Sequence, residues 1–398
     1  MTTTTPSIRM PGTLDEISAE WLTSALRTTD TIQADSHVSK MSWELLGEGQ
    51  GFLGDLARIS LEYEGTPGPK TAVLKIPTTK PENRGLGVMF SAYENEVRFY
   101  NELAQHTKIR MPQCYFVDLE DEPASAVIAA RVLGALPERV TLWLLDRLAT
   151  AAGKADRRYI VLMEDLGETR IGDQVAGATV EEAGNALEVL AEFHATYWNN
   201  PVLNRKWIVR QDDTPLVVQG LYERAFPVFD ERFRSQIDAP TRAVIDWVTA
   251  NGPELLRRIG GGTQTLVHGD YRMDNLTFYD GEATPVGMID FQGVSSGHPL
   301  TDVAYFLRPN LDPDVADAAE DDLLHRYHAA LVKHGVTDYS WEQLEREYDL
   351  AQLWVLHRGV ILIGSLDMSH ERGVKIVERA IERALRVASR IDTSKALA

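Results

Sequence analysis

Three features that would restrict where this chain can work are scarce or missing. Cys114 is the only cysteine in 398 residues, so an internal disulfide cannot form, which suits a reducing compartment. No apolar run approaches the roughly 20 residues that a membrane-spanning helix needs. The start, Met1–Ile8, lacks both the basic residues and the apolar core of a signal peptide. We therefore expect a cytoplasmic protein with no membrane partner.

Basic residues are scarce as well. The chain has 40 Lys and Arg against 59 Asp and Glu, which gives a net charge of −19. Nucleic acids and anionic membranes are bound through basic patches, so neither is expected as a partner. The acidity can keep the protein soluble, or it can attract a cationic substrate. We prefer the first interpretation, because net charge alone says little about function.

The order of the predicted elements indicates two lobes of different composition. Apolar and β-branched residues predict short strands early in the chain, at 43–46, 56–63, 71–76 and 159–163. Helical spacing predicts helices at 13–26 and 88–105, and helices dominate after residue 164. We therefore predict an α+β fold with a small antiparallel-sheet lobe, 1–163, and a larger helical lobe, 164–398.

One segment carries most of the functional information: Leu266–Asn275, which reads LVHGDYRMDN. A carboxylate, Asp270, is followed five residues later by an amide, Asn275, in a loop after a short apolar strand. The kinase catalytic loop has this order, and there the Asp accepts the proton of the attacking hydroxyl while the Asn ligates Mg²⁺. Asp270 is thus the candidate catalytic residue. Arg272 is a second candidate, which can touch the γ-phosphate or brace the loop; both roles stay open.

A second acidic position completes a candidate metal site. Asp290 follows Asn275 by fifteen residues and begins a segment like the Asp-Phe-Gly motif of kinases, with Gln in place of Gly. The turn residues Asp280–Gly281 predict a hairpin between them, with Asn275 and Asp290 opposite each other at its open end. An amide oxygen and a carboxylate that converge are suitable Mg²⁺ ligands, so we expect both residues to bind the metal.

A lysine and a glutamate upstream fit the nucleotide-binding part of the same chemistry. Lys75 lies on the third predicted strand, where protein kinases carry the lysine that contacts the α- and β-phosphates. Glu96, at the edge of the apolar face of the next predicted helix, would form the ion pair that holds this lysine. Glu94 and Glu102 are rivals for that role. We assign Lys75 and Glu96 to ATP binding.

Two further segments are assigned to ATP from their position in the chain. Gly47, Gly49 and Gly51 lie between the first two predicted strands, where a glycine flap lets backbone amides approach phosphate oxygens. Their spacing departs from that of the kinase glycine loop, and an ordinary hairpin loop is the alternative. Glu164 and Leu166 follow the apolar strand at the junction of the lobes, where their backbone would bind adenine.

Together these segments resemble the phosphotransferase-enzyme family of aminoglycoside phosphotransferases, choline kinases and ecdysteroid kinase-like proteins, and the last branch fits best. The resemblance covers about Trp43–Leu307 and rests on four motifs, which are HGD-x4-N from His268, IDFQ from Ile289, MEDL from Met163 and LAEFHA from Leu190. It implies a bilobal protein-kinase-like fold and transfer of a phosphoryl group from ATP-Mg²⁺ to the hydroxyl of a small molecule. It also implies that Asp302 braces the catalytic loop from the start of a helix.

Two other functions are compatible with parts of the sequence. Gly293–Gly297 matches the G-x-S-x-G nucleophile elbow of hydrolases, with Ser295 as the nucleophile, but the alternating strands and helices of that fold are missing. A pseudokinase, which binds nucleotide as a scaffold without turnover, would be expected to have lost a residue of the catalytic, metal or phosphate-binding set. All are present, so we expect an enzyme, a phosphotransferase with an alcohol group as acceptor.

The acceptor is inferred from the segment Thr196–Phe229, which is rich in aromatic residues. Tyr197 and Trp198 are expected in the core. A further set of side chains is expected to wall a mostly apolar pocket over Asp270: Trp207, Tyr222, Phe226, Phe229, Trp354, His357 and Arg358. The acidic residues that an aminoglycoside would need are interleaved with arginines. We therefore predict a small, fairly apolar alcohol, with an aminoglycoside or macrolide antibiotic as the alternative.

Overall fold

The computed structural model divides the chain into two compact units. Unit 1 comprises Met1–Gln105, Met111–Leu136 and Trp143–Glu168, and unit 2 comprises His106–Arg110, Pro137–Leu142 and Thr169–Ala398. The residues that the structure describes are 8–46, 54–78, 80, 83–84, 87–88, 91–120, 136–137, 139–141, 143–144, 147, 158–282, 284–365 and 371–393. The division of function between residues 1–163 and 164–398 stays a prediction.

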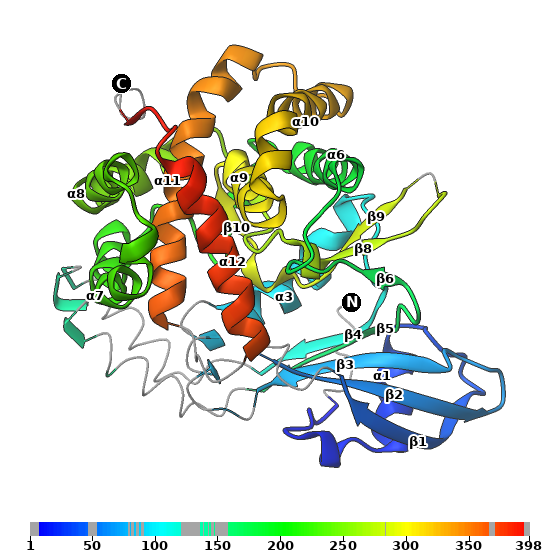
Figure 1. Ribbon diagram of the computed structural model, residues 1–398. Coiled ribbons are helices and arrows are strands. Elements are labelled where there is room, and N and C mark those ends of the chain that lie inside the picture. The colour runs from blue at the N-terminus through cyan, green and yellow to red at the C-terminus, as the bar shows by residue number, and fades with distance from the viewer. Residues whose placement is uncertain are drawn as a thin grey trace. The chain divides into compact units, whose positions relative to one another are not determined.

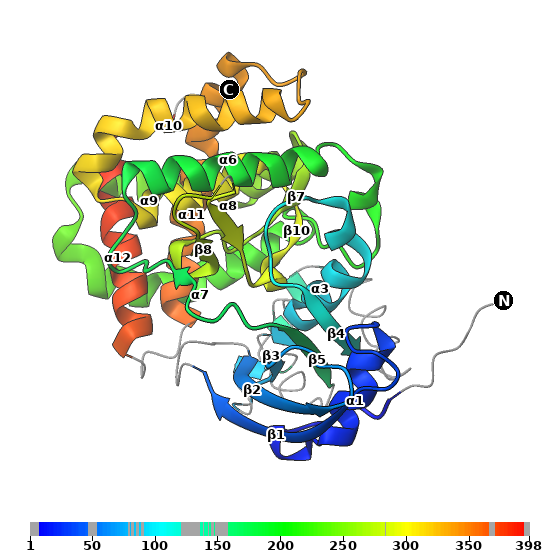
Figure 2. The same ribbon diagram turned by 90° about the vertical axis from the view of Figure 1, so that its right-hand side faces the viewer.

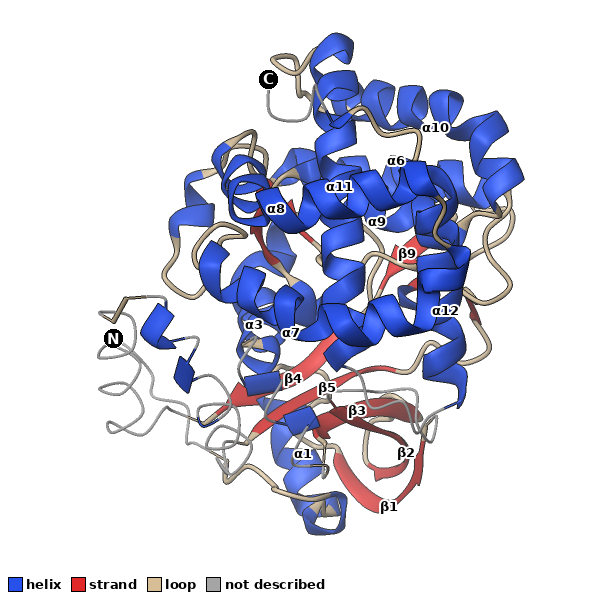
Figure 3. Cartoon of the chain, turned by 60° about the vertical axis from the view of Figure 1, so that its left-hand side comes forward, coloured by secondary structure: helices blue, strands red, loops and turns tan. Residues whose placement is uncertain are grey.

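Unit 1 is built on a five-stranded antiparallel sheet (Figure 3). Its strands are β1 (His37–Leu45), β2 (Gly54–Glu64), β3 (Thr71–Pro77), β4 (Cys114–Leu119) and β5 (Tyr159–Glu164). The strand order is β1-β2-β3-β5-β4, so β1 and β4 form the edges. β3 and β5 lie inside the sheet and are mostly buried, which explains their nearly continuous apolar sequence.

Each face of this sheet is covered by one helix. α1 (Ala19–Thr28) packs on the face that carries Leu74, and α3 (Ala92–Arg98) packs on the opposite face through Tyr93. Side chains alternate between the two faces along a strand. Leu74 therefore points to α1, whereas its neighbour Lys75 points to α3.

Two elements of unit 1 differ from the sequence prediction, and a third is new. The helix predicted at 13–26 starts only after Ser18, because the Ser18 side chain accepts the amide hydrogen of Trp21 (3.1 Å) and caps the helix there. In the described part of the helix predicted at 88–105, α3 ends at Arg98 and the chain continues as the π-helical turn Phe99–Leu103. Strand β4 has no counterpart among the predicted strands.

Unit 2 is mainly helical, with α11 (Trp341–Ser365) at its centre (Figure 1). The helices that pack on α11 include α7 (Pro215–Phe233), α8 (Ala239–Gly261), α9 (Pro299–Asn310) and α12 (Glu371–Ala388). α6 (Val180–Thr196) lies along α10 (Pro313–Lys333), as Figure 2 shows. Within the described residues, we find no helix with the length and apolar character needed to cross a bilayer.

Short strands in unit 2 hold both ends of the candidate catalytic loop. β7 (Thr265–Val267) precedes the loop and pairs with β10 (Ser295–Gly297). β8 (Leu276–Phe278) follows the loop and pairs with β9 (Val286–Met288) on one side and with β6 (Arg170–Ile171) on the other. The loop between β7 and β8 is therefore fixed at each end by backbone hydrogen bonds.

Candidate active site

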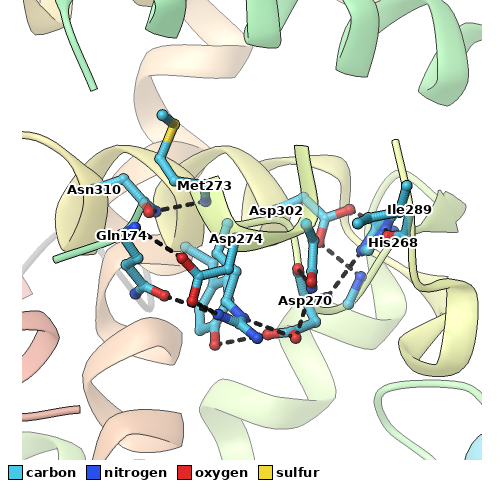
Figure 4. A network of polar contacts seen from close by, with 12 residues as sticks. Gln174, His268, Asp270, Met273, Asp274, Ile289, Asp302 and Asn310 are labelled. Carbon is cyan, nitrogen blue, oxygen red and sulfur yellow. Dashed lines mark hydrogen bonds and ion pairs between the residues drawn. The ribbon is translucent and has the colours of Figure 1, made fainter. Parts of the chain in front are cut away.

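The first turn of α9 supports the loop from behind. Asp302 in that turn is 2% exposed, and its Oδ2 and Oδ1 accept hydrogen bonds from the amides of His268 (2.6 Å) and Gly269 (2.9 Å), as Figure 4 shows for the first. Gly269 has a φ of 77°, and a Cβ there would stand 2.1 Å from the Gly293 carbonyl oxygen. The tight turn therefore requires glycine. Asp302 braces the loop, as the family resemblance implies.

A buried histidine supports Asp302 in turn. His194, from the LAEFHA motif in α6, places its Nε2 3.3 Å from Asp302 Oδ2 and its Nδ1 2.7 Å from Tyr327 Oη. Burial lowers the pKa of His194, although Asp302 opposes this effect, so the ring is neutral near pH 7. The neutral ring donates from Nε2 to the carboxylate and accepts the tyrosine hydroxyl at Nδ1. The motif thus holds the brace rather than the substrate.

The carboxylate of Asp270 is ordered by three donors. Its Oδ2 accepts from Arg272 Nε (3.0 Å) and Asn275 Nδ2 (2.9 Å), and its Oδ1 accepts from Tyr305 Oη (3.1 Å). Burial raises the pKa of Asp270, but the positive charges of Arg272 and Arg358 outweigh burial and bring the pKa down to about 2. The side chain keeps 31% of its exposure. An ionised, ordered and partly accessible carboxylate can accept a hydrogen bond from a hydroxyl.

Arg272 is tied into the loop on three sides. Besides Asp270, its Nη1 binds Asp274 Oδ2 (2.7 Å) and Gln174 Oε1 (3.3 Å), and its side chain is 15% exposed. The backbone amide of Gln174 also donates to Asp274 Oδ1 (2.9 Å; Figure 4). Burial lowers the pKa of Arg272, but the negative neighbours Asp270 and Asp274 more than offset it, so the pKa is raised. These contacts account for bracing of the loop, and contact with a phosphate stays a prediction.

The predicted hairpin forms, with a register one residue different from the prediction. Leu276 pairs with Met288, and the Ile289 amide donates to the Asn275 carbonyl oxygen (3.0 Å), so Asn275 faces Ile289 rather than Asp290. Asp290 comes directly after this pair, at the open end of the hairpin. The expectation that the two candidate ligands face each other was therefore wrong by one position.

The donor set at the open end of the hairpin fits a Mg²⁺ ion. Asn275 is 4% exposed, and its Nδ2 donates to the backbone oxygen (2.8 Å) and Oδ2 of Asp270, which turns its amide oxygen away from that residue. Asp290 has a φ of 66°, a left-handed conformation that a non-glycine residue adopts only when its surroundings enforce it. No group of three His, Cys, Asp or Glu side chains within the described residues could hold a metal by itself. A few protein oxygens completed by phosphate and water are what Mg²⁺ prefers.

Lys75 and Glu96 form an ion pair in the interior of unit 1. Lys75 Nζ lies 3.0 Å from each carboxylate oxygen of Glu96, and the two residues are 5% and 1% exposed. The rivals Glu94 and Glu102 both bind Arg98, at 2.7 Å and 3.1 Å. Glu96, which the sequence favoured over Glu94 and Glu102, is therefore the residue that pairs with Lys75. Burying an ion pair is costly, which favours a functional reason for placing one there.

Of the other residues assigned to ATP, Glu164 lies at the end of a strand with its amide paired. Gly47, Gly49 and Gly51 lie outside the described residues. Glu164 ends β5, its amide donates to the Gln113 carbonyl oxygen (2.8 Å), and its side chain accepts the Gln113 amide (3.1 Å). The Glu164 backbone amide is therefore already paired within the sheet and is not available to a base.

An ion pair that the sequence did not predict fixes the chain between Glu164 and Leu166. Asp165 Oδ2 accepts from Arg58 Nε (2.8 Å) of β2, and Asp165 Oδ1 accepts the Gly167 amide (3.1 Å). Burial opposes the charge, but these hydrogen bonds outweigh it and lower the pKa of Asp165. The ion pair thus anchors the end of β5 to β2, across the intervening strand β3.

The family model of the ecdysteroid kinase-like family matches residues 48–336, which is well over half of the chain. The chain belongs to the ecdysteroid kinase-like family. Membership confirms the predicted resemblance, and with it a family of kinase-like phosphotransferases.

Solved structures agree with this family in fold. A choline kinase from Cryptosporidium parvum superposes with a TM-score of 0.52 at 9% identity, over 93% of this chain and 96% of that enzyme. At this identity the likeness concerns the fold alone. It confirms the predicted α+β, protein-kinase-like class, with a small antiparallel sheet and a larger helical part.

Curated relatives of this family member match only short stretches. A stretch of 62 residues is 40% identical to the probable acyl-CoA dehydrogenase IBR3 of Arabidopsis thaliana, covering 16% of this chain and 7% of that protein. A stretch of 61 residues is 33% identical to human acyl-CoA dehydrogenase family member 11, again 7% of that protein. The chain therefore spans a small part of these relatives.

The structure also corrects the predicted wall of the acceptor pocket. Tyr222 and Phe229 are fully buried in the core of unit 2, and His357 is 1% exposed and stacks on Tyr222 at 4.6 Å between ring centroids. Tyr197 is 1% exposed, as predicted. The helical spacing of apolar residues does not distinguish an aromatic ring in the core from one that lines a pocket, which explains the error. Of the predicted set, Arg358 contacts the catalytic loop.

Sequence reasoning missed Tyr305 beside Asp270, and it expected Arg358 in the pocket wall rather than on the backbone of the loop. Tyr305 donates to Asp270, and Arg358 Nη2 donates to the Gly269 carbonyl oxygen (2.8 Å). Tyr305 carries no motif, and only its position three residues after Asp302 on one helix could have placed it near the loop. The rival Ser295 belongs to β10 and pairs with Val267, so it is not on the strand-to-helix elbow that a hydrolase needs.

Proposed function

We propose that the protein transfers the γ-phosphoryl group of ATP, with Mg²⁺, to the hydroxyl of a small, fairly apolar alcohol. The ordered and ionised carboxylate of Asp270 carries this proposal. As the acceptor oxygen bonds to phosphorus and ADP leaves, the hydroxyl proton would pass to Asp270. A carboxyl with a pKa of about 2 is a weak base. It suits a transfer in which the proton leaves late and positioning supplies most of the rate.

The remaining assignments extend the same proposal. Lys75, held by Glu96, would contact the α- and β-phosphates, and Asn275 and Asp290 would ligate Mg²⁺, which neutralises phosphate charge. The glycine segment and the Glu164–Leu166 backbone would cover the phosphates and bind adenine. Nucleotide binding would thus fall in residues 1–163 and catalysis in 164–398. The scarcity of cysteine supports a cytoplasmic location.

The charges around Asp270 support an acceptor without ammonium groups. Arg272 and Arg358 both act on Asp270 electrostatically. A substrate cation about 5 Å from one of them would be repelled by about 3 kcal/mol at an effective dielectric constant of about 20. Two acidic residues of the segment considered for the acceptor are paired with arginines: Asp212 binds Arg210, and Asp230 binds two arginines of unit 2. A polycationic aminoglycoside would therefore find little to neutralise it here.

A screen for ATP consumption tests the acceptor class. The library would contain apolar alcohols, sugars, choline-like amines, aminoglycosides and macrolides, with the Asp270→Ala variant as the matched control. We expect turnover with a neutral alcohol and a loss of roughly 10²–10⁴-fold in the variant, with nucleotide binding retained in calorimetry. Preference for an aminoglycoside would overturn the acceptor class. ATP binding without turnover on any acceptor would indicate a pseudokinase scaffold.

A further inference from the structure

The hydrogen bonds to Asp270 are distributed unevenly between its two oxygens. Oδ2 accepts two donors, Arg272 Nε (3.0 Å) and Asn275 Nδ2 (2.9 Å). Oδ1 accepts one, the hydroxyl of Tyr305 (3.1 Å). A carboxylate offers about four acceptor positions. In the described part of the chain no further donor reaches this carboxylate, so the open position lies on Oδ1.

An acceptor alcohol that uses Asp270 must therefore donate to the same oxygen as Tyr305. Two hydroxyls that share one acceptor oxygen lie close to each other, since each O–H···O distance is about 2.7 Å. The ring that carries the Tyr305 hydroxyl would then border the place where the alcohol binds. Asp270 keeps 31% of its side-chain exposure, so it remains accessible to a ligand.

Tyr305 is itself fixed by α11. The guanidinium carbon of Arg358 lies 5.2 Å from the centre of the Tyr305 ring and 5.3 Å from that of Trp354. The same guanidinium donates from Nη2 to the carbonyl oxygen of Gly269, the residue before Asp270 (2.8 Å). Arg358 thus holds both the tyrosine and the backbone next to the carboxylate, so their relative position is set by two helices.

We propose that Tyr305 is a positioning residue for phosphoryl transfer, whose hydroxyl orients Oδ1 of Asp270 toward the hydroxyl of the acceptor. The proposal rests on the proposed function, because it takes Asp270 as the group that receives the acceptor's proton. Tyr305 keeps its own proton throughout and makes no bond to phosphorus. Tyr305 lies outside every motif that carries the family resemblance, so it adds a new residue to the proposed site.

The test uses Tyr305→Phe, which removes one hydroxyl and keeps the ring under Arg358. Because the acceptor is unidentified, the probe is release of inorganic phosphate from ATP-Mg²⁺ with water as acceptor. We expect kcat to fall about tenfold, the effect of one lost hydrogen bond, while KM for ATP stays unchanged. The control is Tyr348→Phe, which removes a hydroxyl that donates to Glu320 (2.6 Å) elsewhere in unit 2. Its kcat should equal that of the wild type.

A double-mutant cycle with Asp270→Asn separates positioning from general damage. If Tyr305 acts through Asp270, Tyr305→Phe should cause no further loss of kcat once Asp270 is changed. Independent tenfold losses in both backgrounds, or an unchanged kcat in Tyr305→Phe, would overturn the role of Tyr305 alone. Absence of ATP turnover in the wild type would instead count against the proposed function, so the two failures are distinguishable.

Discussion

Replacing Asp302 by alanine should be among the most damaging changes in unit 2, although the residue touches no substrate. Its two carboxylate oxygens accept the amides of His268 (2.6 Å) and Gly269 (2.9 Å), and Oδ2 also lies 3.3 Å from Nε2 of His194. All three donors are buried with it. Alanine would leave each of them without its acceptor.

The expected loss follows from these three bonds. A hydrogen bond to a charged group contributes about 1.5–3 kcal/mol, so three of them predict a loss of about 4–5 kcal/mol even at the lower end. This is close to the whole stability of a small domain, about 5–15 kcal/mol. Asp302→Asn keeps the shape but turns an N–H₂ group toward one of the donors. We expect it to lose about half as much, because one carbonyl oxygen remains to accept.

Urea unfolding followed by circular dichroism measures both losses, and amide exchange at His268 and Gly269 locates them. The matched control is Asp238→Ala, which removes an aspartate that caps α8 by accepting the Thr241 amide (2.9 Å) at the surface. That change should cost about 1 kcal/mol. A loss in Asp302→Ala no larger than in the control, or unchanged protection of the two amides, would falsify the bracing argument.

Four further substitutions test other parts of the structure. Lys75→Met should cost about 3 kcal/mol in urea unfolding, because the buried Glu96 carboxylate loses its lysine; equal stability of wild type and variant would contradict this. Asp290→Ala should abolish the Mg²⁺ dependence of ATP binding in calorimetry, whereas Asn275→Ala should only raise the Mg²⁺ requirement. Burial lowers the pKa of His357 to about 4, so its neutral form stabilises the fold above pH 6.5 and this contribution is lost as the pH falls through 4. His357→Gln should therefore lose about 3 kcal/mol less than the wild type between pH 7 and pH 4, and parallel urea midpoints would contradict it.

The parts of the site that the sequence predicts are those encoded locally. Asp270 and Asn275 lie in one short loop, and their contact is set by a spacing of five residues. The Lys75–Glu96 pair joins neighbouring elements, a strand and the helix that follows it, so periodicity along each places both side chains on the same side. Such patterns are visible in a single sequence because few residues separate the partners.

The parts that the sequence does not predict depend on helices packing together. Arg358 reaches Gly269 across 89 positions; the sequence placed it in a pocket wall over Asp270 but did not predict its hydrogen bond to the backbone of the loop. The predicted register of the hairpin was wrong because its turn centres on Glu282, whereas the prediction centred it between two residues. This small shift moves each strand residue opposite a different partner. The aromatic rings of α7 were wrongly assigned to a pocket, because residues that face the core and residues that line a pocket recur at the same helical spacing.

The catalytic loop and α9 run past each other in matching order, and this accounts for how a short irregular segment becomes rigid. Asp302 holds the amides of 268 and 269, Tyr305 holds Asp270, and Asn310 Oδ1 accepts the Met273 amide (3.0 Å). Each helix residue thus contacts a loop residue further along than the one before. A loop tied at three points along one helix cannot shift at a single residue without breaking the others. The precision of the site therefore comes from α9, in which Tyr305 and Asn310 lie outside every motif that points to phosphoryl transfer.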